Sequence, residues 1–101
     1  MVSVFALYAK PEDERAFLDH YAQVHAPLAR SLPGILSLNW GQPGTLFQDD
    51  DSGWFLIAEM RFSDRDQALA ALASEAGKKA GKDLAAFAKG LVTMRMVEWY
   101  E

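Results

Sequence analysis

The first residues of the chain alternate in a way that predicts a β-strand. Residues 2–8 read Val-Ser-Val-Phe-Ala-Leu-Tyr, and both faces of a strand with this sequence are largely apolar. Strands that are apolar on both faces usually lie inside a sheet whose two sides are covered. We therefore expect residues 2–8 to form a central strand.

A helical period replaces this alternation after Lys10. Pro11 suits the first turn of a helix, and the three acids that follow it favour the positive end of the helix dipole. Apolar side chains then recur every three to four residues, at Phe17, Tyr21, Val24, Leu28 and Leu32. We expect the helix to end at Leu32-Pro33-Gly34.

Pro27 lies inside this predicted helix. Its missing N–H and its ring leave the carbonyl of Gln23 without a helical partner, so the helix should kink there. A ring nitrogen of His25 or a water molecule could then bond that carbonyl. Pro27 and His25 thus belong to one locally altered stretch of helix.

The remaining elements follow from the same two periods. Residues 35–40 alternate as a strand with one wetter face, and a hairpin loop of about ten residues follows. Residues 54–62 form a second two-sided strand. Its expected core face is Trp54, Leu56, Ala58, Met60 and Phe62.

Two helical segments and a last strand complete the chain. Ser63-Asp-Arg-Asp66 has the form of a capping box before an Ala/Leu-rich helix. Ser74, followed by Glu75 and Gly77, predicts a second cap or a bend before residues 78–89 continue as a helix. Residues 91–99 form the closing strand.

The resulting order, β-α-β-β-α-β, predicts a four-stranded antiparallel sheet with both helices on one face. This is the ferredoxin-like α+β sandwich, and we expect one domain over residues 1–101. The other face of the sheet is left uncovered, and it would carry Phe5, Leu7, Phe55 and Ile57 or the opposite set. Exposing such an apolar face to water is unfavourable, so we expect two copies to pair sheet to sheet as a dimeric barrel.

Composition adds to this expectation. Half of the residues are hydrophobic, including six Phe, three Trp and three Tyr. A chain of about this size buries only somewhat over 60% of its unfolded surface. The apolar excess therefore indicates burial against a partner chain or around a pocket.

Charge and cysteine content exclude several classes of partner. The formal net charge is −4, without a run of Lys and Arg, so we do not expect nucleic acid as a partner. The chain contains no cysteine, which excludes disulfides, thiolate nucleophiles and Cys-ligated metals. No basic leader or long apolar run is present, so we expect no membrane contact and a cytoplasmic location.

Several short segments, in their order and spacing, resemble the EthD family of dimeric α+β barrel proteins. They are Phe17, Tyr21, His25, Pro27-Leu28, Leu32-Pro33-Gly34, Ser74-Glu75-Ala76-Gly77, Asp83-Leu84, Phe87-Ala88 and Gly90-Leu91-Val92-Thr93. The resemblance implies a ferredoxin-like protomer that pairs through its sheets, with a small apolar cavity between helices and sheet. It implies no obligatory metal or organic cofactor.

The resemblance does not select a reaction. Barrels of this kind include cofactor-free monooxygenases, polyketide cyclases, muconolactone isomerases and haem-degrading enzymes. Family members accompany catabolic or biosynthetic oxidations and are often labelled reductases. This sequence has no Gly-x-Gly-x-x-Gly segment after a strand to bind a dinucleotide.

His25 is the strongest catalytic candidate. It follows Tyr21 by four residues and shares the edge of the apolar helix face, so it should point toward the cavity. An imidazole can take and give a proton near neutral pH, as enolisation or cyclisation of a carbonyl compound requires. The alternative is that His25 only bonds backbone or partner-chain groups and fixes the bend.

Tyr21 could bond a substrate oxygen or orient His25, although a buried tyrosine is more often part of the core. His20 falls toward the polar flank and is expected at the surface. Two histidines five residues apart do not share one face of an α-helix, so they make a poor metal site. Asp49-Asp50-Asp51 lacks the ligand alternation of a calcium loop and is expected to be a solvated hairpin tip.

Aromatic and other apolar residues supply a candidate substrate pocket, although aromatic residues in strands are usually plain core. The expected pocket residues are Leu28, Trp40, Trp54, Met60, Phe62 and Phe87.

Together these observations lead us to expect a homodimer that acts on a small hydrophobic or aromatic oxygenated molecule. The expected chemistry is cofactor-independent oxidoreduction or isomerisation in a catabolic or secondary pathway, with His25 and Tyr21 as catalytic residues. A binding or accessory module for a partner oxygenase is the first alternative. A haem-binding or haem-degrading protein, with His25 as iron ligand, is the second.

Overall fold

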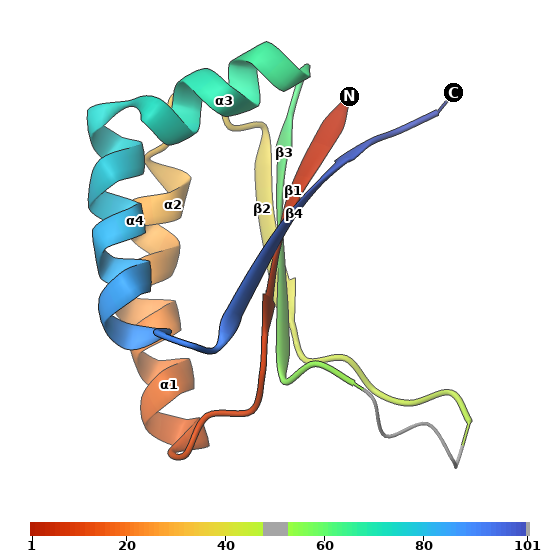
Figure 1. Ribbon diagram of the computed structural model, residues 1–101, viewed down its shortest axis with the longest axis vertical. Helices are drawn as coiled ribbons and strands as arrows, with labels where there is room; N and C mark the ends of the chain where they lie inside the picture. The colour runs from red at the N-terminus through yellow and green to blue at the C-terminus, as the bar shows by residue number, and fades with distance from the viewer. Residues whose placement is uncertain (48–52, 101) are drawn as a thin grey trace.

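The computed structural model describes residues 1–47 and 53–100 and contains one antiparallel sheet (Figure 1). The sheet order is β2-β3-β1-β4, so the first strand lies in the interior as its two apolar faces predict. The strands are β1 (Val2–Tyr8), β2 (Ser37–Gly41), β3 (Leu56–Phe62) and β4 (Val92–Glu98).

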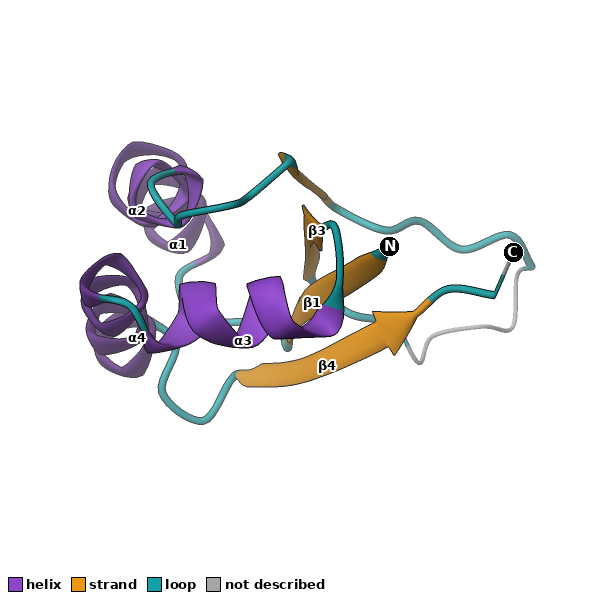
Figure 2. Ribbon diagram, turned by 90° about the horizontal axis from the view of Figure 1, so that it is seen from above, coloured by secondary structure: helices purple, strands orange, loops and turns teal. Residues whose placement is uncertain are grey.

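All helices cover the same face of the sheet, as two views at right angles show (Figures 1 and 2). They are α1 (Glu14–His20), a π-helical turn η1 (Tyr21–His25), α2 (Ala26–Arg30), α3 (Arg65–Ala73) and α4 (Glu75–Phe87). The predicted ferredoxin-like βαββαβ arrangement is therefore confirmed. No helix in the described ranges is long and apolar enough to cross a membrane.

The core lies between the helices and the even-numbered residues of the two central strands. Val2, Val4, Ala6 and Tyr8 of β1 are buried, and their partners on β3 are buried beside them. The predicted core face of β3 is correct over residues 56–62. Trp54 lies outside the strand and is partly exposed.

The opposite face of the sheet carries the odd-numbered residues and no helix. Phe5, Leu7 and Ile57 lie there, each half-buried. Phe55 precedes β3, and its ring packs edge-on against Phe17 of α1 with the centroids 5.8 Å apart. The predicted open face is correct for Phe5, Leu7 and Ile57, and Phe55 belongs with the helix side.

Side chains cap the helices close to the predicted positions. Asp13 caps α1 by accepting from the Ala16 N–H at 3.0 Å. Asp64, rather than Ser63, caps α3, because its carboxylate accepts from the Gln67 N–H at 2.8 Å. Ser74 caps α4, as expected.

The first helical run departs from an α-helix in the turn before Pro27. The Ala26 N–H bonds the carbonyl of Tyr21, five residues back, so the turn holds one residue more than an α-turn. Pro27 then falls in the first turn of α2, where a missing N–H is tolerated. A kink was expected at Pro27, and the structure has a widened turn just before it instead. Gly34, with φ of 79°, follows the end of this helical run.

The corner between α3 and α4 depends on Gly77. A side chain there would begin with a Cβ atom that collides with the carbonyl oxygens of Leu72 and Ala71. Both oxygens belong to backbone, so they cannot move aside as a flexible side chain would. The short Ser74-to-Gly77 turn therefore requires glycine.

We expect Gly77→Ala to lower the free energy of unfolding by about 1–3 kcal/mol, because it overpacks a backbone contact. Gly81→Ala is the matched control in the same helix, since its Cβ would meet no atom within 4 Å. That control should gain about 0.5–1 kcal/mol from helix propensity. Urea denaturation of both variants measures the difference, and equal stabilities would contradict this account of the corner.

Candidate active site

His25 ends the π-helical turn and is 7% exposed. Its Nδ1 atom lies 3.0 Å from Oδ2 of Asp83, which α4 presents to it. The expected bond from a His25 ring nitrogen to a freed backbone carbonyl is replaced at Nδ1 by this carboxylate. When His25 is neutral, Nδ1–H donates to Asp83 and Nε2 keeps the lone pair that can accept a proton.

His20 bonds the other oxygen of the same carboxylate. Its Nε2 atom lies 2.8 Å from Oδ1 of Asp83, and its side chain is 34% exposed. His20 is partly exposed at the surface, as expected, but it shares Asp83 with His25, so the expectation that the two histidines do not share a face of the helix is wrong. The widened turn holds more residues than an α-turn, so two residues five apart come onto one side of the helix.

Asp83 was not singled out as a functional residue by the sequence reasoning. It appeared there only beside Leu84 in the family resemblance. A signal for it did exist, because Asp83 is an acid at the edge of the apolar stripe of α4, four residues before Phe87. Burying a carboxylate costs free energy unless a partner pairs with its charge, so an acid in that position indicates a buried partner.

Aromatic rings enclose the two imidazoles. The Phe87 ring lies 4.6 Å from the His20 ring and 5.0 Å from the His25 ring, centroid to centroid. The Tyr21 ring lies 5.4 Å from His25 and 4.9 Å from Trp40. These contacts fix the ring planes and keep water away from the inner imidazole.

Burial sets the protonation of the site. Burial lowers the pKa of His25, and the positive charge of His20 acts in the same direction, while the hydrogen bond and charge of Asp83 oppose them. Burial also raises the pKa of Tyr21 to about 12, although Arg30 opposes it. At neutral pH the site therefore offers a neutral imidazole and a protonated phenol.

A cavity of about 70 Å³ lies between the helices and the sheet and is lined on one side by His25. The rest of its wall is apolar, with Met60 and Met94 from the sheet and small residues such as Ala80 and Gly81 from α4. A space of this size accepts a few non-hydrogen atoms. It can hold a small molecule or the reactive end of a larger one.

The expected pocket residues occupy several places. Met60 lines the cavity with His25, and Phe87 covers both imidazoles. Phe62 is fully buried in the core beside Ala68 and Ala71 of α3.

The other three residues lie nearer the surface. Trp40 packs on Tyr21, and Trp54 lies before β3 with part of its ring exposed. Leu28 lines an outer groove between α2 and α4, together with Asp83. The structure therefore joins His25, Tyr21, Met60 and Phe87 around the site and places Leu28 and Trp54 away from the cavity.

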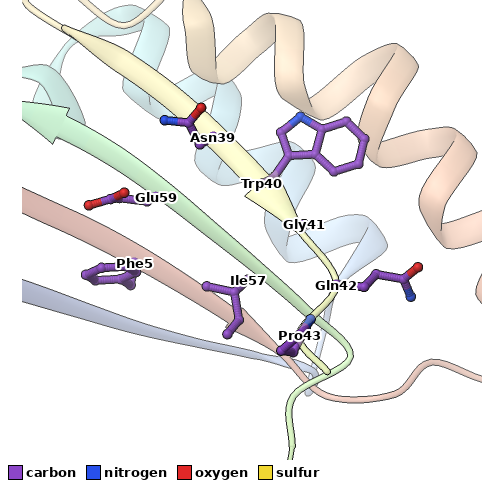
Figure 3. Close-up of a pocket in the computed structure, with 8 residues that line it drawn as sticks. All are labelled: Phe5, Asn39, Trp40, Gly41, Gln42, Pro43, Ile57 and Glu59. Atoms are coloured by element: carbon purple, nitrogen blue, oxygen red, sulfur yellow. The ribbon is translucent and has the colours of Figure 1, made fainter. Parts of the chain in front are cut away.

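A second hollow lies on the open face of the sheet. Phe5, Ile57 and Glu59 lie side by side there, and the Trp40 indole turns to the helix side (Figure 3). A chain of hydrogen bonds ends at the carboxylate: Trp99 Nε1–H donates to Ser3 Oγ at 2.8 Å, and Ser3 Oγ–H donates to Glu59 at 2.6 Å. This carboxylate is thus already bonded within its own chain.

Neither a metal nor a haem site emerges from the described residues. No group of three or more His, Asp or Glu side chains in residues 1–47 and 53–100 is arranged to hold a metal ion. Haem does not fit the cavity at His25, because a porphyrin is several times larger than 70 Å³. The Asp49-Asp50-Asp51 segment lies outside the described residues.

The fold and this cluster define a ferredoxin-like α+β protein with an imidazole–carboxylate–imidazole site under its helices. A family model for the EthD domain matches residues 9–90. An uncharacterized 11.0 kDa protein in the thcB-thcC intergenic region of Rhodococcus erythropolis is 35% identical over 94 residues, which cover 93% of this chain and 90% of that one. The chain belongs to the EthD family, which confirms the resemblance.

Solved structures agree. An EthD family protein from Bacillus halodurans C-125 superposes with a TM-score of 0.89 at 34% identity, over 99% of both chains. A hydroxynitrile lyase from Passiflora edulis shares the fold, with a TM-score of 0.72 at 16% identity over 99% of this chain and 95% of that one. So does a dimeric ferredoxin-like protein of unknown function from Bacteroides fragilis NCTC 9343, with a TM-score of 0.67 at 16% identity over 97% and 95%.

The lowered pKa of His25 predicts how stability depends on pH. In the unfolded chain a histidine binds a proton below about pH 6.5, whereas the folded protein resists protonating His25. Stability should therefore be greatest above pH 6.5 and fall as the pH is lowered from there toward the folded pKa. One such group contributes a slope of at most about 1.4 kcal/mol per pH unit.

His25→Gln should flatten this dependence in the range that begins near pH 6.5 and extends downward from there. Urea denaturation at several pH values measures the slope for both proteins, whatever their absolute stabilities. Parallel curves for the wild type and the variant would contradict a lowered pKa at His25.

Proposed function

We propose that this EthD-family protein moves a proton on a small apolar, oxygenated molecule, with His25 as the group that exchanges the proton. One observation carries the proposal: a buried imidazole is hydrogen-bonded through Nδ1 to a carboxylate and borders an otherwise apolar cavity. A carboxylate behind Nδ1 orients the ring and stabilises the imidazolium that forms when Nε2 takes a proton.

Burial lowers the pKa of His25, so its imidazole is neutral near pH 7 and can act as a base. A neutral imidazole in a water-poor cavity can take a proton from carbon next to a carbonyl group, as an isomerisation requires. Tyr21 does not line the cavity; its buried, protonated phenol ring packs against His25, so its role in this proposal is to hold the His25 ring in place. The hydroxynitrile lyase with this fold is an example of an enzyme on such a scaffold.

Proton exchange can be tested with a simple probe. In D₂O, the wild-type protein should speed the replacement of hydrogen by deuterium next to the carbonyl of cyclopentanone, followed by proton NMR. His25→Gln should slow this reaction by about 10²- to 10⁴-fold, the usual contribution of a positioned acid or base. Gln23→Ala, an exposed change in the same helical turn, is the matched control and should keep the wild-type rate.

Two outcomes would count against this function. Wild-type protein that is no faster than free imidazole at equal concentration would remove the catalytic proposal. Native mass spectrometry that finds a tightly held molecule of unchanged mass after long incubation would favour the binding or accessory module instead.

We further propose that two copies pair through the open faces of their sheets. This face carries half-buried apolar side chains around Phe5, with Glu59 on one neighbouring strand and Arg95 on the other, both in register with it. A two-fold interface brings the same patch against itself, so a patch with both an acid and a base complements itself. The Bacteroides fragilis protein with this fold is dimeric.

Phe5→Arg should convert the dimer to a monomer, because it places a new charge at the centre of the buried apolar patch. Leu69→Arg is the control, since Leu69 is an exposed leucine on α3, in the helix layer. Light scattering at micromolar concentration measures the mass of each. A monomeric wild type, or a dimeric Phe5→Arg variant, would contradict pairing through this face.

A further inference from the structure

We propose that His20, Asp83 and His25 act as one charge-compensating unit, in which His20 gives a proton to the surface as His25 takes one from the molecule in the cavity. Asp83 and His20 are then positioning residues, since neither lines the cavity. The inference rests on the proposed function of His25.

The hydrogen bonds form a continuous chain of three groups. One carboxylate bonds both imidazoles, with His20 Nε2 at 2.8 Å from Oδ1 and His25 Nδ1 at 3.0 Å from Oδ2. Because the two rings bond different oxygens, each can donate a proton to Asp83 at the same time. The negative charge of Asp83 therefore stabilises a positive charge on either ring.

The backbone is altered where the unit requires it. The two histidines stand at the last residue of α1 and the last residue of the π-helical turn. Such turns are rare in proteins and frequently occur at functional sites. In an uninterrupted α-helix, residues five apart point in directions about 140° apart around the axis. Here one carboxylate of α4 bonds both rings.

The two ends of the unit open into different spaces. His20 lines a surface pocket of about 340 Å³ together with Glu12, Asp13 and Phe87. His25 lines the inner cavity of about 70 Å³. Phe87 packs against both rings and also lines the surface pocket.

One proton leaves the unit through His20 for each proton that enters it at His25. In the proposed cycle, the starting state has a proton on each nitrogen of His20, an ionised Asp83, and a neutral His25 whose proton lies on Nδ1 toward Asp83. When the substrate loses a proton to Nε2 of His25, His20 loses one from Nδ1, the ring nitrogen that does not bond Asp83, to water in the surface pocket. The unit stays neutral, so the buried imidazolium forms without a second positive charge beside it. The reverse steps return a proton to the product.

Other ionisable groups also face the unit and set its working range. Beneath and around it are Tyr8 and Tyr21 from the core, Lys79 and Lys82 beside Asp83, and Glu12 and Asp13 around His20. Tyr8 and Tyr21 stay neutral near pH 7, since burial raises the pKa of both. Histidine is the side-chain type whose ordinary pKa lies between about pH 6 and about pH 8, so the titration is followed on the histidines.

The test is an NMR titration of the protein labelled with ¹⁵N-histidine, without any added ligand, from about pH 5 to about pH 8. In the wild type, the His25 nitrogens should respond in two steps, one of which coincides with the protonation of His20. In His20→Gln, His25 should titrate in a single step, moved up by roughly one pH unit, because the repelling charge is gone. In Asp83→Asn, the His25 step should move down.

Asp19→Asn is the control, since it removes an exposed charge beside His20 and leaves the three groups in place. It should leave the His25 titration as in the wild type. If His20→Gln does not fold, the wild-type curves still decide, because single independent steps for the two histidines would overturn the proposal. An unchanged His25 midpoint in folded His20→Gln would overturn it as well.

This titration separates the inference from the proposed function. Coupled histidines in a protein that does not exchange cyclopentanone would leave the unit intact and remove the catalytic role. Exchange that depends on His25 in a protein with uncoupled histidines would do the opposite.

Discussion

One carboxylate ties together the helical segments that cover the sheet. Asp83 of α4 reaches both the end of α1 and the end of the π-helical turn, with hydrogen bonds of 2.8 and 3.0 Å. Replacing either imidazole by an apolar group would leave one oxygen of this partly buried carboxylate without its imidazole partner, which is costly. Phe87 packs against both of these rings, and the charge and hydrogen bond of Asp83 act on the pKa of His25 against the effect of burial.

The sequence was informative wherever a single period governed the chain. Alternation placed β1 and the core face of β3 correctly, and side-chain chemistry placed the caps at Ser74 and, within one residue, at Asp64. The turn before Pro27 was not predictable in this way, because inserting one residue in a helix hardly changes a three-to-four residue spacing. The pairing of His20 with Asp83 depended on that insertion and on a contact across 63 positions, which no local pattern records.

The two faces of the sheet are specialised differently. On the helix side, His20, Asp83 and His25 form one hydrogen-bonded cluster among apolar and aromatic residues. The open side mixes apolar residues with Glu59 and Arg95, and the Glu59 carboxylate is already bonded by Ser3, which Trp99 bonds in turn. A partner can cover this face without leaving the Glu59 carboxylate unpaired, because Ser3 of the same chain already donates a hydrogen bond to it.

The inner cavity has a wall made in two parts. The first helical run contributes the ionisable group, whereas α4 contributes Gly77, Ala80 and Gly81, where side chains are minimal. Gly81 has room for a methyl group, whereas the α3–α4 corner fixes Gly77 as glycine. Adding or removing a single methyl group on α4 would therefore change the volume of the cavity and leave His25 itself unchanged.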